Sequence, residues 1–241
     1  EYLKAFFDHS SEHPNGWGLA FLDDQNVSIE REPVRAKDSL YLRNRLTGKI
    51  ESRRMMGHIR KATIGDISFN NTHPFTKVDE SGRRWVLVHN GTIFDAPKLS
   101  PYQYTQEGTS DSERILLYIV DRVNKHILSE LNSFDVNERM NLIDEIVVSL
   151  SKGNKLNLLL YDGDYFYVHM NEAETLYKYE QDEVVCFSTH PLCDAKWEEI
   201  PRNQLLVYKD GKLVYTGTKH DHDYIFNEED MKMIYMQYAT L

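Results

Sequence analysis

Cysteine is scarce in this sequence of 241 residues, which contains Cys186 and Cys193 alone. Two cysteines do not make a disulfide scaffold, so a reducing, cytoplasmic setting fits best. Long hydrophobic runs are missing: no window of about 18 apolar residues predicts a membrane-spanning helix. The first residues, 1–4, also lack the basic start and apolar run of a signal peptide.

Positive charge is in short supply as well. Lysine and arginine number 28 against 38 acidic residues, and the net charge is −10. Nucleic-acid binding needs a basic surface, and the one basic cluster, in residues 43–54, is interrupted by Glu51. We therefore expect no nucleic-acid partner and no membrane association.

Metal-binding and phosphate-binding signatures are absent from the sequence. It has no His-Glu-x-x-His, no Cys-x-x-Cys and no glycine-rich phosphate loop. His58, His73 and His89 raise the question of a metal site, but no pair of them has ligand spacing. We expect neither a metal nor a cofactor.

The apolar pattern that is present switches between two periods. Helical spacing predicts helices at residues 1–12, 36–46, from 110 onward, around 140–150 and at 228–238. Short apolar or alternating runs predict strands at 17–22, 27–31, 55–60, 85–89, 155–161, 165–170, 175–179, 183–188, 204–208 and 213–216. Helices that follow one another in the chain argue against a Rossmann fold or a barrel. We expect an α+β fold, with helices layered over antiparallel sheets, as one domain over residues 1–241.

Two charged residues are candidates for holding a small zwitterion. Arg60 ends an expected strand, and its guanidinium can bind a carboxylate through two parallel hydrogen bonds, although a structural salt bridge is the commoner use of a single arginine. Asp111 lies in the first turn of an expected helix, where it can cap the helix or bind an ammonium group. Ser110 and Glu113 beside it have capping-box spacing.

Asn90-Gly91 follows a short apolar strand and has two interpretations. Asn-Gly is a strong signal for a tight hairpin turn. An asparagine amide and the next backbone N–H can also converge on one oxygen as an oxyanion hole, with glycine allowing close approach. Gly16 and Gly18 around Trp17 likewise have two interpretations. They predict either a β-bulge or a pocket wall that a ligand can approach closely.

A cysteine nucleophile within the sequence is not expected. Cys193 follows His190 by three residues, but a thiolate needs a base within hydrogen-bond reach. Cys186 has the pattern of a core strand residue, and Cys193 lies in a loop after Pro191.

The order and spacing of several segments resemble a known family. These segments are His13–Gly18, Gly57–Thr63, Asn71–Phe75, Val88–Gly91 and Ser110–Glu113. They resemble the glutaminase domain of class-II glutamine amidotransferases, which are N-terminal-nucleophile (Ntn) hydrolases. The resemblance is closest to the short subfamily without a fused synthase, and it implies a four-layer α/β/β/α sandwich of two antiparallel sheets between helices.

The resemblance also implies roles for individual residues. Arg60 would bind the α-carboxylate of glutamine, Asp111 its α-ammonium group, and Asn90 with Gly91 the oxyanion. The other implied pocket residues are Thr63 and His73 as lining, and Trp17 with Gly16 as a wall near the nucleophile. In the implied reaction an N-terminal cysteine attacks the side-chain amide, releasing ammonia and then glutamate.

This chain departs from the family pattern in three places. No cysteine precedes residue 186, so activity requires an N-terminal cysteine upstream of Glu1, in a segment that we expect to exist. Without it, the same pocket would serve a catalytically inactive amino-acid-binding or regulatory module. His13-Pro14 and Lys61 replace an Arg-Gly pair and an aromatic residue of the synthase-fused members. The substrate is therefore glutamine or another γ-glutamyl amide.

The sequence contains no domain that would bind an ammonia acceptor. A synthase that uses the ammonia would have to be a separate partner, and the sequence does not define its identity or the oligomeric state of this chain.

Overall fold

The structure is a computed structural model that describes residues 2–23, 26–129 and 134–238. The α-helices are α1 (Tyr2–Asp8), α2 (Leu40–Arg45), α3 (Asp111–Ser129), α4 (Val136–Ser151) and α5 (Glu228–Tyr238). Short 3₁₀ helices cover His9–Ser11, Ala36–Asp38, Phe69–Asn71 and Pro97–Tyr104. The strands are β1 (Trp17–Asp23), β2 (Asn26–Glu32), β3 (Met55–Ile59), β4 (Phe75–Val78), β5 (Arg84–His89), β6 (Leu158–Tyr161), β7 (Phe166–His169), β8 (Tyr177–Gln181), β9 (Val184–Ser188), β10 (Glu198–Glu199), β11 (Leu206–Lys209) and β12 (Lys212–Thr216).

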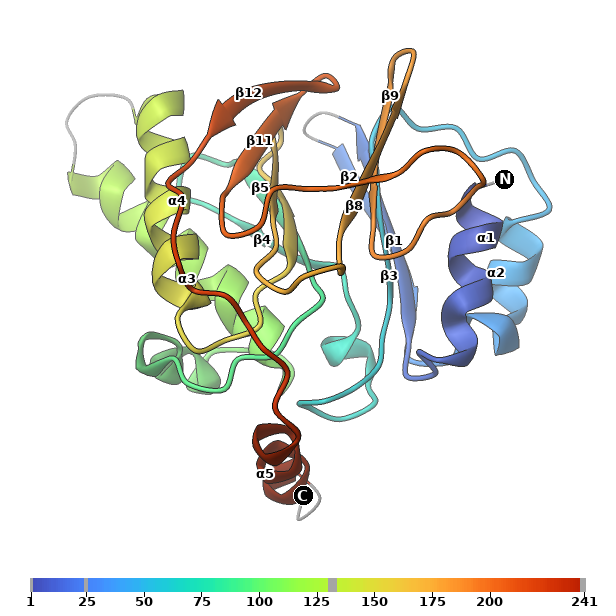
Figure 1. The fold of residues 1–241 in the computed structure, drawn as a ribbon, viewed down its shortest axis with the longest axis horizontal. Coiled ribbons are helices and arrows are strands. Elements are labelled where there is room, and N and C mark those ends of the chain that lie inside the picture. The colour runs from blue at the N-terminus through green and yellow to red at the C-terminus, as the bar shows by residue number, and fades with distance from the viewer. Residues whose placement is uncertain (1, 24–25, 130–133, 239–241) are drawn as a thin grey trace.

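The elements stack in four layers, as expected from the resemblance (Figure 1). Helices α3 and α4 cover a six-stranded antiparallel sheet of order β12-β11-β7-β6-β5-β4. A second layer of strands packs on its other face, and α1 and α2 cover that layer from outside. The second layer differs from the prediction, because it consists of two separate sheets, β2-β1-β3 and β10-β8-β9.

The alternation along β1 explains why the layers stack in this way. Trp17, Leu19 and Phe21 point outward and pack with α1 and α2. Ala20 and Leu22 point inward and pack with β5 and β6. Successive residues of a strand face opposite sides, so each face of β1 buries one apolar set.

The predicted elements occur with small shifts. Residue 1 of the expected first helix lies outside the described residues. The helix expected over 36–46 is divided at Ser39, whose hydroxyl accepts the Leu42 N–H at 2.9 Å and caps α2. Strands β4 and β10 were not predicted; they are short, with four and two residues.

The capping box predicted at Ser110 is wrong. The Ser110 hydroxyl accepts the N–H of Ser112 at 3.2 Å. The Glu113 carboxylate accepts the N–H groups of Glu107 and Gly108 at 2.7 and 2.9 Å. A true capping box begins the next helix, α4, with Asp135 and Glu138, which exchange the two bonds of this motif.

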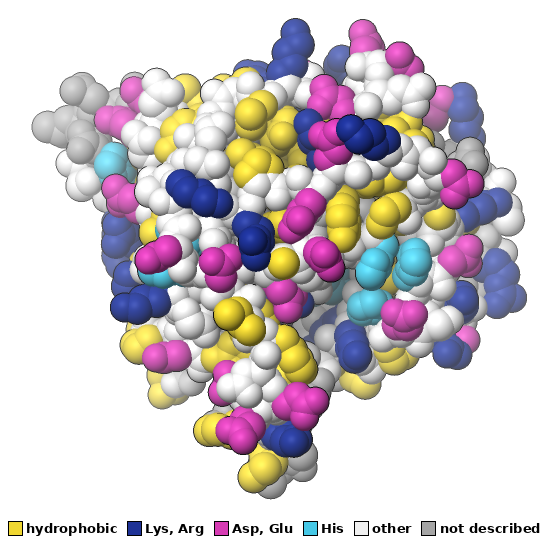
Figure 2. All heavy atoms as spheres, viewed as in Figure 1, with side chains coloured by type: hydrophobic (Ala, Val, Ile, Leu, Met, Phe, Trp, Pro, Cys, Tyr) yellow, Lys and Arg dark blue, Asp and Glu magenta, His cyan; other side chains and the backbone are white. Residues whose placement is uncertain are grey.

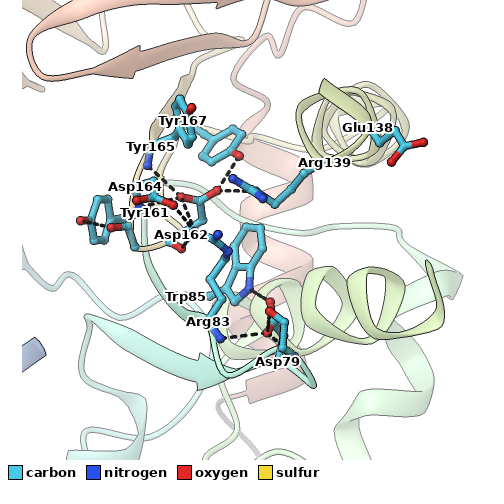
Figure 3. A network of polar contacts seen from close by, with 12 residues as sticks. Asp79, Arg83, Trp85, Glu138, Arg139, Tyr161, Asp162, Asp164, Tyr165 and Tyr167 are labelled. Carbon is cyan, nitrogen blue, oxygen red and sulfur yellow. Dashed lines mark hydrogen bonds and ion pairs between the residues drawn. The ribbon is translucent and has the colours of Figure 1, made fainter. Parts of the chain in front are cut away.

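A buried polar network attaches α4 to the hairpin between β6 and β7 (Figure 3). Asp162, which is fully buried, accepts the Nε–H of Arg139 at 2.7 Å and the hydroxyl of Tyr167 at 2.8 Å. Its other oxygen accepts the N–H groups of Asp164 and Tyr165. Each lone pair of the carboxylate is thereby directed at a donor, and the charge of Arg139 is compensated inside the protein.

We predict that Asp162→Ala lowers the free energy of unfolding by about 3–5 kcal/mol, because it leaves a buried arginine unpaired. Asp164→Ala is the matched control on the same turn. Its side chain is 42% exposed and pairs with Arg83, so its loss is expected to cost less than about 1 kcal/mol. Urea denaturation of both variants measures the difference, and equal losses would contradict a special role for the buried pair.

Candidate active site

A pocket of about 370 Å³ opens where three elements end. Arg60 directly follows β3, Asn90 directly follows β5, and Asp111 is the first residue of α3. These three residues line the pocket together with the predicted Gly91, Thr63 and His73. Six of the eight predicted site residues therefore lie around one cavity.

Arg60 is 4% exposed and is held by its own loop. Its Nη1 donates to the Asp66 carbonyl at 2.7 Å, and its Nη2 donates to the carbonyls of Ile64 and Gly65 at 3.0 Å each. Three of its five N–H groups are thus in use, which leaves Nε–H and one Nη1–H for a ligand. Two parallel bonds to a carboxylate, as predicted from the sequence, would require one of these carbonyls to move.

Asp111 is 6% exposed and is held by backbone N–H groups. One oxygen accepts the N–H of Ile93 at 2.9 Å, and the other accepts the N–H of Ser112 at 2.9 Å. The helix dipole of α3 also favours an anion in its first turn. The carboxylate is therefore stabilised without a cationic partner.

The two charges share the pocket without forming an ion pair with each other in the described part of the chain. Burial lowers the pKa of Arg60, and the nearby charge of Asp111 partly offsets this effect. A buried cation and anion that remain apart are complementary to a ligand that carries both charges. A free amino acid is such a ligand.

Asn71 joins the loops that carry these two charges. Its side-chain oxygen accepts the N–H groups of Thr109 and Ser110 at 2.7 and 3.0 Å, immediately before Asp111. Its side-chain nitrogen donates to the Asp66 carbonyl at 3.0 Å, in the loop that binds Arg60. One buried amide therefore fixes the spacing between the cationic and the anionic side of the pocket.

The Asn90-Gly91 segment does not form a hairpin turn. The Asn90 N–H donates to the Asn157 carbonyl at 2.8 Å and the Thr92 N–H to the Lys155 carbonyl at 3.0 Å, so this segment continues alongside residues 155–157. In an antiparallel ladder the intervening N–H, that of Gly91, points the other way. A Cβ at residue 91 would collide with the Lys155 carbonyl and the His89 ring, so the position requires glycine.

Trp17 and Gly16 are not among the residues that line this pocket. Trp17 is 0% exposed and faces the helix layer, and its indole N–H donates to Glu32 at 3.0 Å. The alternation along β1 directs the Trp17 side chain away from the six-stranded sheet, and its place beside the nucleophile stays a prediction. Gly16 acts through its carbonyl, which accepts the N–H of Arg60 at 2.8 Å.

Two histidines form one wall of the pocket, the half-buried His58 and the buried His73. The rings of His58 and His73 lie with their centroids 4.0 Å apart, and both nitrogens of His73 lack a partner among the described residues. Burial lowers the pKa of His58 to about 3, and that of His73 falls well below its ordinary value. Both rings are therefore neutral at pH 7. Among the described side chains, no group of three or more potential ligands could hold a metal ion.

Several residues around the pocket were missed by sequence reasoning. They are Ser112, Lys155, Tyr224, Phe226 and Met231, whereas His13 and Lys61, singled out as departures from the family pattern, also line the pocket. Ser112 could have been found from its place beside Asp111; its hydroxyl bonds Nδ1 of His89 at 3.0 Å. No local sequence motif marks Lys155 and the three C-terminal residues as site residues. They reach the pocket only because the chain folds back on itself.

The two cysteines of the sequence do not line the pocket. Cys186 lies on β9, and burial raises the pKa of its thiol to about 11. A thiol with this pKa is not deprotonated at neutral pH, so Cys186 is a poor nucleophile.

Sequence comparison relates the chain to a known family. A sequence model described as glutamine amidotransferases class-II matches residues 3–179. An uncharacterised protein of Methanocaldococcus jannaschii is 27% identical, with 90% of this chain and 67% of that protein covered. The γ-glutamyl-hercynylcysteine sulfoxide hydrolase of Mycolicibacterium smegmatis is 25% identical, with 86% of this chain and 83% of that protein covered.

A solved structure shares the fold. The crystal structure of a predicted glutamine amidotransferase from Pseudomonas aeruginosa superimposes with a TM-score of 0.61 at 22% identity, covering 83% of this chain and 87% of that one. Since the family match spans most of the sequence, the chain belongs to the class-II glutamine amidotransferases. No helix in the described part of the chain is long and apolar enough to cross a membrane.

We predict that the free energy of unfolding falls as the pH decreases from about 6.5 toward 3. Histidines of an unfolded chain titrate near 6.5, whereas His58 and His73 stay neutral in the fold. The unfolded state then binds more protons, so acid favours unfolding. His73→Leu should flatten this pH dependence, relative to wild type, in urea denaturation measured at each pH. If the free energy of unfolding of His73→Leu falls as steeply with decreasing pH as that of wild type, the prediction of a neutral His73 is wrong.

Proposed function

We propose that this protein hydrolyses the side-chain amide of glutamine, or of a related γ-glutamyl amide, to glutamate and an amine or ammonia. The proposal rests on one observation. Arg60 and Asp111 are both buried beside the same pocket, and they form no ion pair with each other among the described residues. The name of the M. smegmatis relative, a hydrolase of a γ-glutamyl compound, favours hydrolysis over transfer.

In this proposal the amino-acid head of the substrate lies between the two charges. Arg60 binds the α-carboxylate through an N–H group that the 64–66 loop leaves unused, and Asp111 binds the α-ammonium. The side-chain carbonyl then points toward Asn90 and Gly91. The Gly91 N–H has no partner among the described residues and donates to the developing oxyanion, with the Asn90 amide as the second donor.

The nucleophile in this proposal is the thiolate of an N-terminal cysteine, outside the printed sequence. It attacks the amide carbon, and its own α-amine takes the thiol proton and delivers it to the leaving nitrogen. Free α-amines have a pKa near 8, which suits both steps at neutral pH. Water then attacks the thioester, and glutamate leaves. Ammonia could also pass to a separate synthase, whose presence would raise the rate of glutamate release.

The decisive experiment uses the protein with its native N-terminus, checked by intact mass. Glutamate release is measured from glutamine and from γ-glutamyl amides. Release that disappears when the N-terminal cysteine is replaced by serine supports the proposal. A protein that binds glutamate but releases none from any such amide would instead be the inactive binding module.

Asn90→Ala is expected to lower kcat by roughly 10²–10³-fold, because one oxyanion donor is lost. KM should change little, since the ground-state carbonyl carries less charge. Asn44→Ala, at an exposed position of α2, is the control and should leave kcat unchanged. A loss of folded protein in place of a loss of kcat would identify Asn90 as a structural residue.

Arg60→Lys is expected to raise KM about 10–100-fold, the effect of losing a charge-assisted hydrogen bond of roughly 1.5–3 kcal/mol. Lysine keeps the charge but cannot also hold the carbonyls of the 64–66 loop. Steady-state kinetics with glutamine measure the change. An unaltered KM would show that the carboxylate is bound elsewhere.

A further inference from the structure

The C-terminal segment, residues 217–238, lines part of the pocket although much of its apolar surface stays exposed. After β12 the chain runs down beside the sandwich to α5 (Figure 1). Tyr224, Phe226 and Met231 line the pocket. Phe226 is nevertheless 60% exposed and Met236 71%, and Figure 2 shows this region projecting from the molecular surface with apolar side chains on it. Burial of these side chains therefore stabilises the segment only weakly, and its polar contacts matter correspondingly more.

Some of these polar contacts join groups that do not titrate. Asn171 is fully buried, and its carbonyl accepts the N–H of Tyr224 at 2.8 Å. The side-chain nitrogen of Asn171 donates to the His222 carbonyl at 3.0 Å. The backbone N–H of His220 donates to the Asn203 carbonyl at 3.0 Å. These bonds attach the segment to the loop after β7 and to the loop before β11 at any pH at which the protein is folded.

A pair of histidines forms a titratable part of the attachment. Burial lowers the pKa of His169 to about 3, so its ring is neutral at pH 7. Nδ1 of His169 lies 2.7 Å from the Leu156 carbonyl, and a carbonyl only accepts, so Nδ1 carries the proton. Nε2 of His169 then accepts from Nε2 of His220, 3.1 Å away. Nδ1 of His220 in turn accepts the N–H of His222 at 3.2 Å. The three contacts together require two protons on the pair.

A third proton has no compatible position in this arrangement. On Nδ1 of His220 it would face the N–H of His222, and two donors cannot bond each other. On Nε2 of His169 it would face the proton on Nε2 of His220. Moving that proton to Nδ1 of His220 restores the conflict with His222. A protonated pair therefore leaves a partly buried donor without an acceptor, which is costly.

Other charged groups around His220 act in both directions. Asp144 on α4 and Asp221 favour the protonated ring, whereas Lys219 and His222 disfavour it. Burial is the largest effect, and it lowers the pKa of His220 below the ordinary value of a histidine. The attached segment thus favours the neutral ring, in agreement with the pattern of donors and acceptors.

We infer that the His169–His220 pair is an acid-sensitive latch that holds the C-terminal segment against the pocket. On a detached segment His220 is an ordinary histidine that titrates near 6.5. The detached state then binds more protons than the attached state, so falling pH favours detachment. The effect begins as the pH falls through about 6.5 and continues until the attached pair is itself protonated.

Detachment changes the pocket, because Tyr224 follows the latch directly and Phe226 and Met231 lie just beyond it. All three side chains would leave the pocket lining together. The latch thus makes the shape of the pocket depend on pH, whichever reaction takes place there. The inference therefore stands or falls independently of the proposed function.

Hydrogen exchange of single amides tests the latch in the whole protein. The N–H of His222 bonds Nδ1 of His220, and the N–H of Tyr224 bonds the Asn171 carbonyl, only while the segment is attached. Their protection factors, corrected for the intrinsic pH dependence of exchange, should fall about threefold to tenfold between pH 6 and 5. Amides of β5 report opening of the whole protein and should stay more protected at each pH. A loss of protection that the segment shares equally with β5 would overturn the inference.

His220→Gln separates proton binding from the contact itself. Glutamine can still donate an N–H to Nε2 of His169, but it does not titrate. The segment amides should be less protected than in wild type at pH 7, because the acceptor of the His222 N–H is lost. Their fall in protection between pH 6 and 5 should largely disappear. Since the half-buried His220 lies on the outer segment, the amides of β5 should keep their wild-type protection.

His222→Gln is the matched control. It removes a neighbouring titratable ring, whose Nδ1 lies 3.3 Å from the Asp221 carboxylate, but keeps the backbone N–H that bonds His220. The pH dependence of wild type should persist in this variant. Protection of the Tyr224 N–H that is constant between pH 6 and 5 in wild type, or that falls equally in His220→Gln, overturns the inference.

Discussion

The separation of two buried opposite charges, Arg60 and Asp111, is the constraint on which the site depends. Opposite charges attract strongly where water is excluded, so their natural arrangement would be a pair. Here each is compensated by the backbone instead, Arg60 by three carbonyls and Asp111 by two N–H groups. Asn71 holds the two loops at a fixed distance. The space between the charges is thereby complementary to a ligand that supplies both missing partners.

This separation also explains why the site lies at the ends of elements from both central layers. Arg60 leaves β3 in one sheet, and Asn90 leaves β5 in the other. Strand β5 is buried on both faces, by α3 and α4 on one side and by β1 on the other, so its end cannot shift without disturbing two cores. The network around Asp162 adds to this by fixing α4 against the same sheet. Packing far from the pocket thus sets the position of the Gly91 N–H.

Sequence reasoning succeeded where the signal is local. Period-two and helical spacing placed the strands and the major helices, and the residues with short motifs, among them Arg60, Asn90 and Asp111, lie together. It failed where a distant partner competes: Ser110 donates its N–H to Asn71 rather than entering a capping box. Trp17 does not line the pocket, and its alternation with Leu19 and Phe21 indicates that it faces the helices. Tyr224 and Lys155 have no local signal, because only tertiary folding brings them to the pocket.

The pocket is lined by two parts of the chain, one inside the family match and one beyond it. Arg60, Asn90, Gly91 and Asp111 all fall within residues 3–179, the part that matches the family. Tyr224, Phe226 and Met231 lie beyond it. A fold can keep its reaction chemistry while other segments set what enters the site. The segment that carries Tyr224 is attached to the core of the sandwich through Asn171 and the His169–His220 pair. Contacts outside the family match therefore position part of the pocket lining, whereas Arg60, Asp111 and Gly91 are positioned within it.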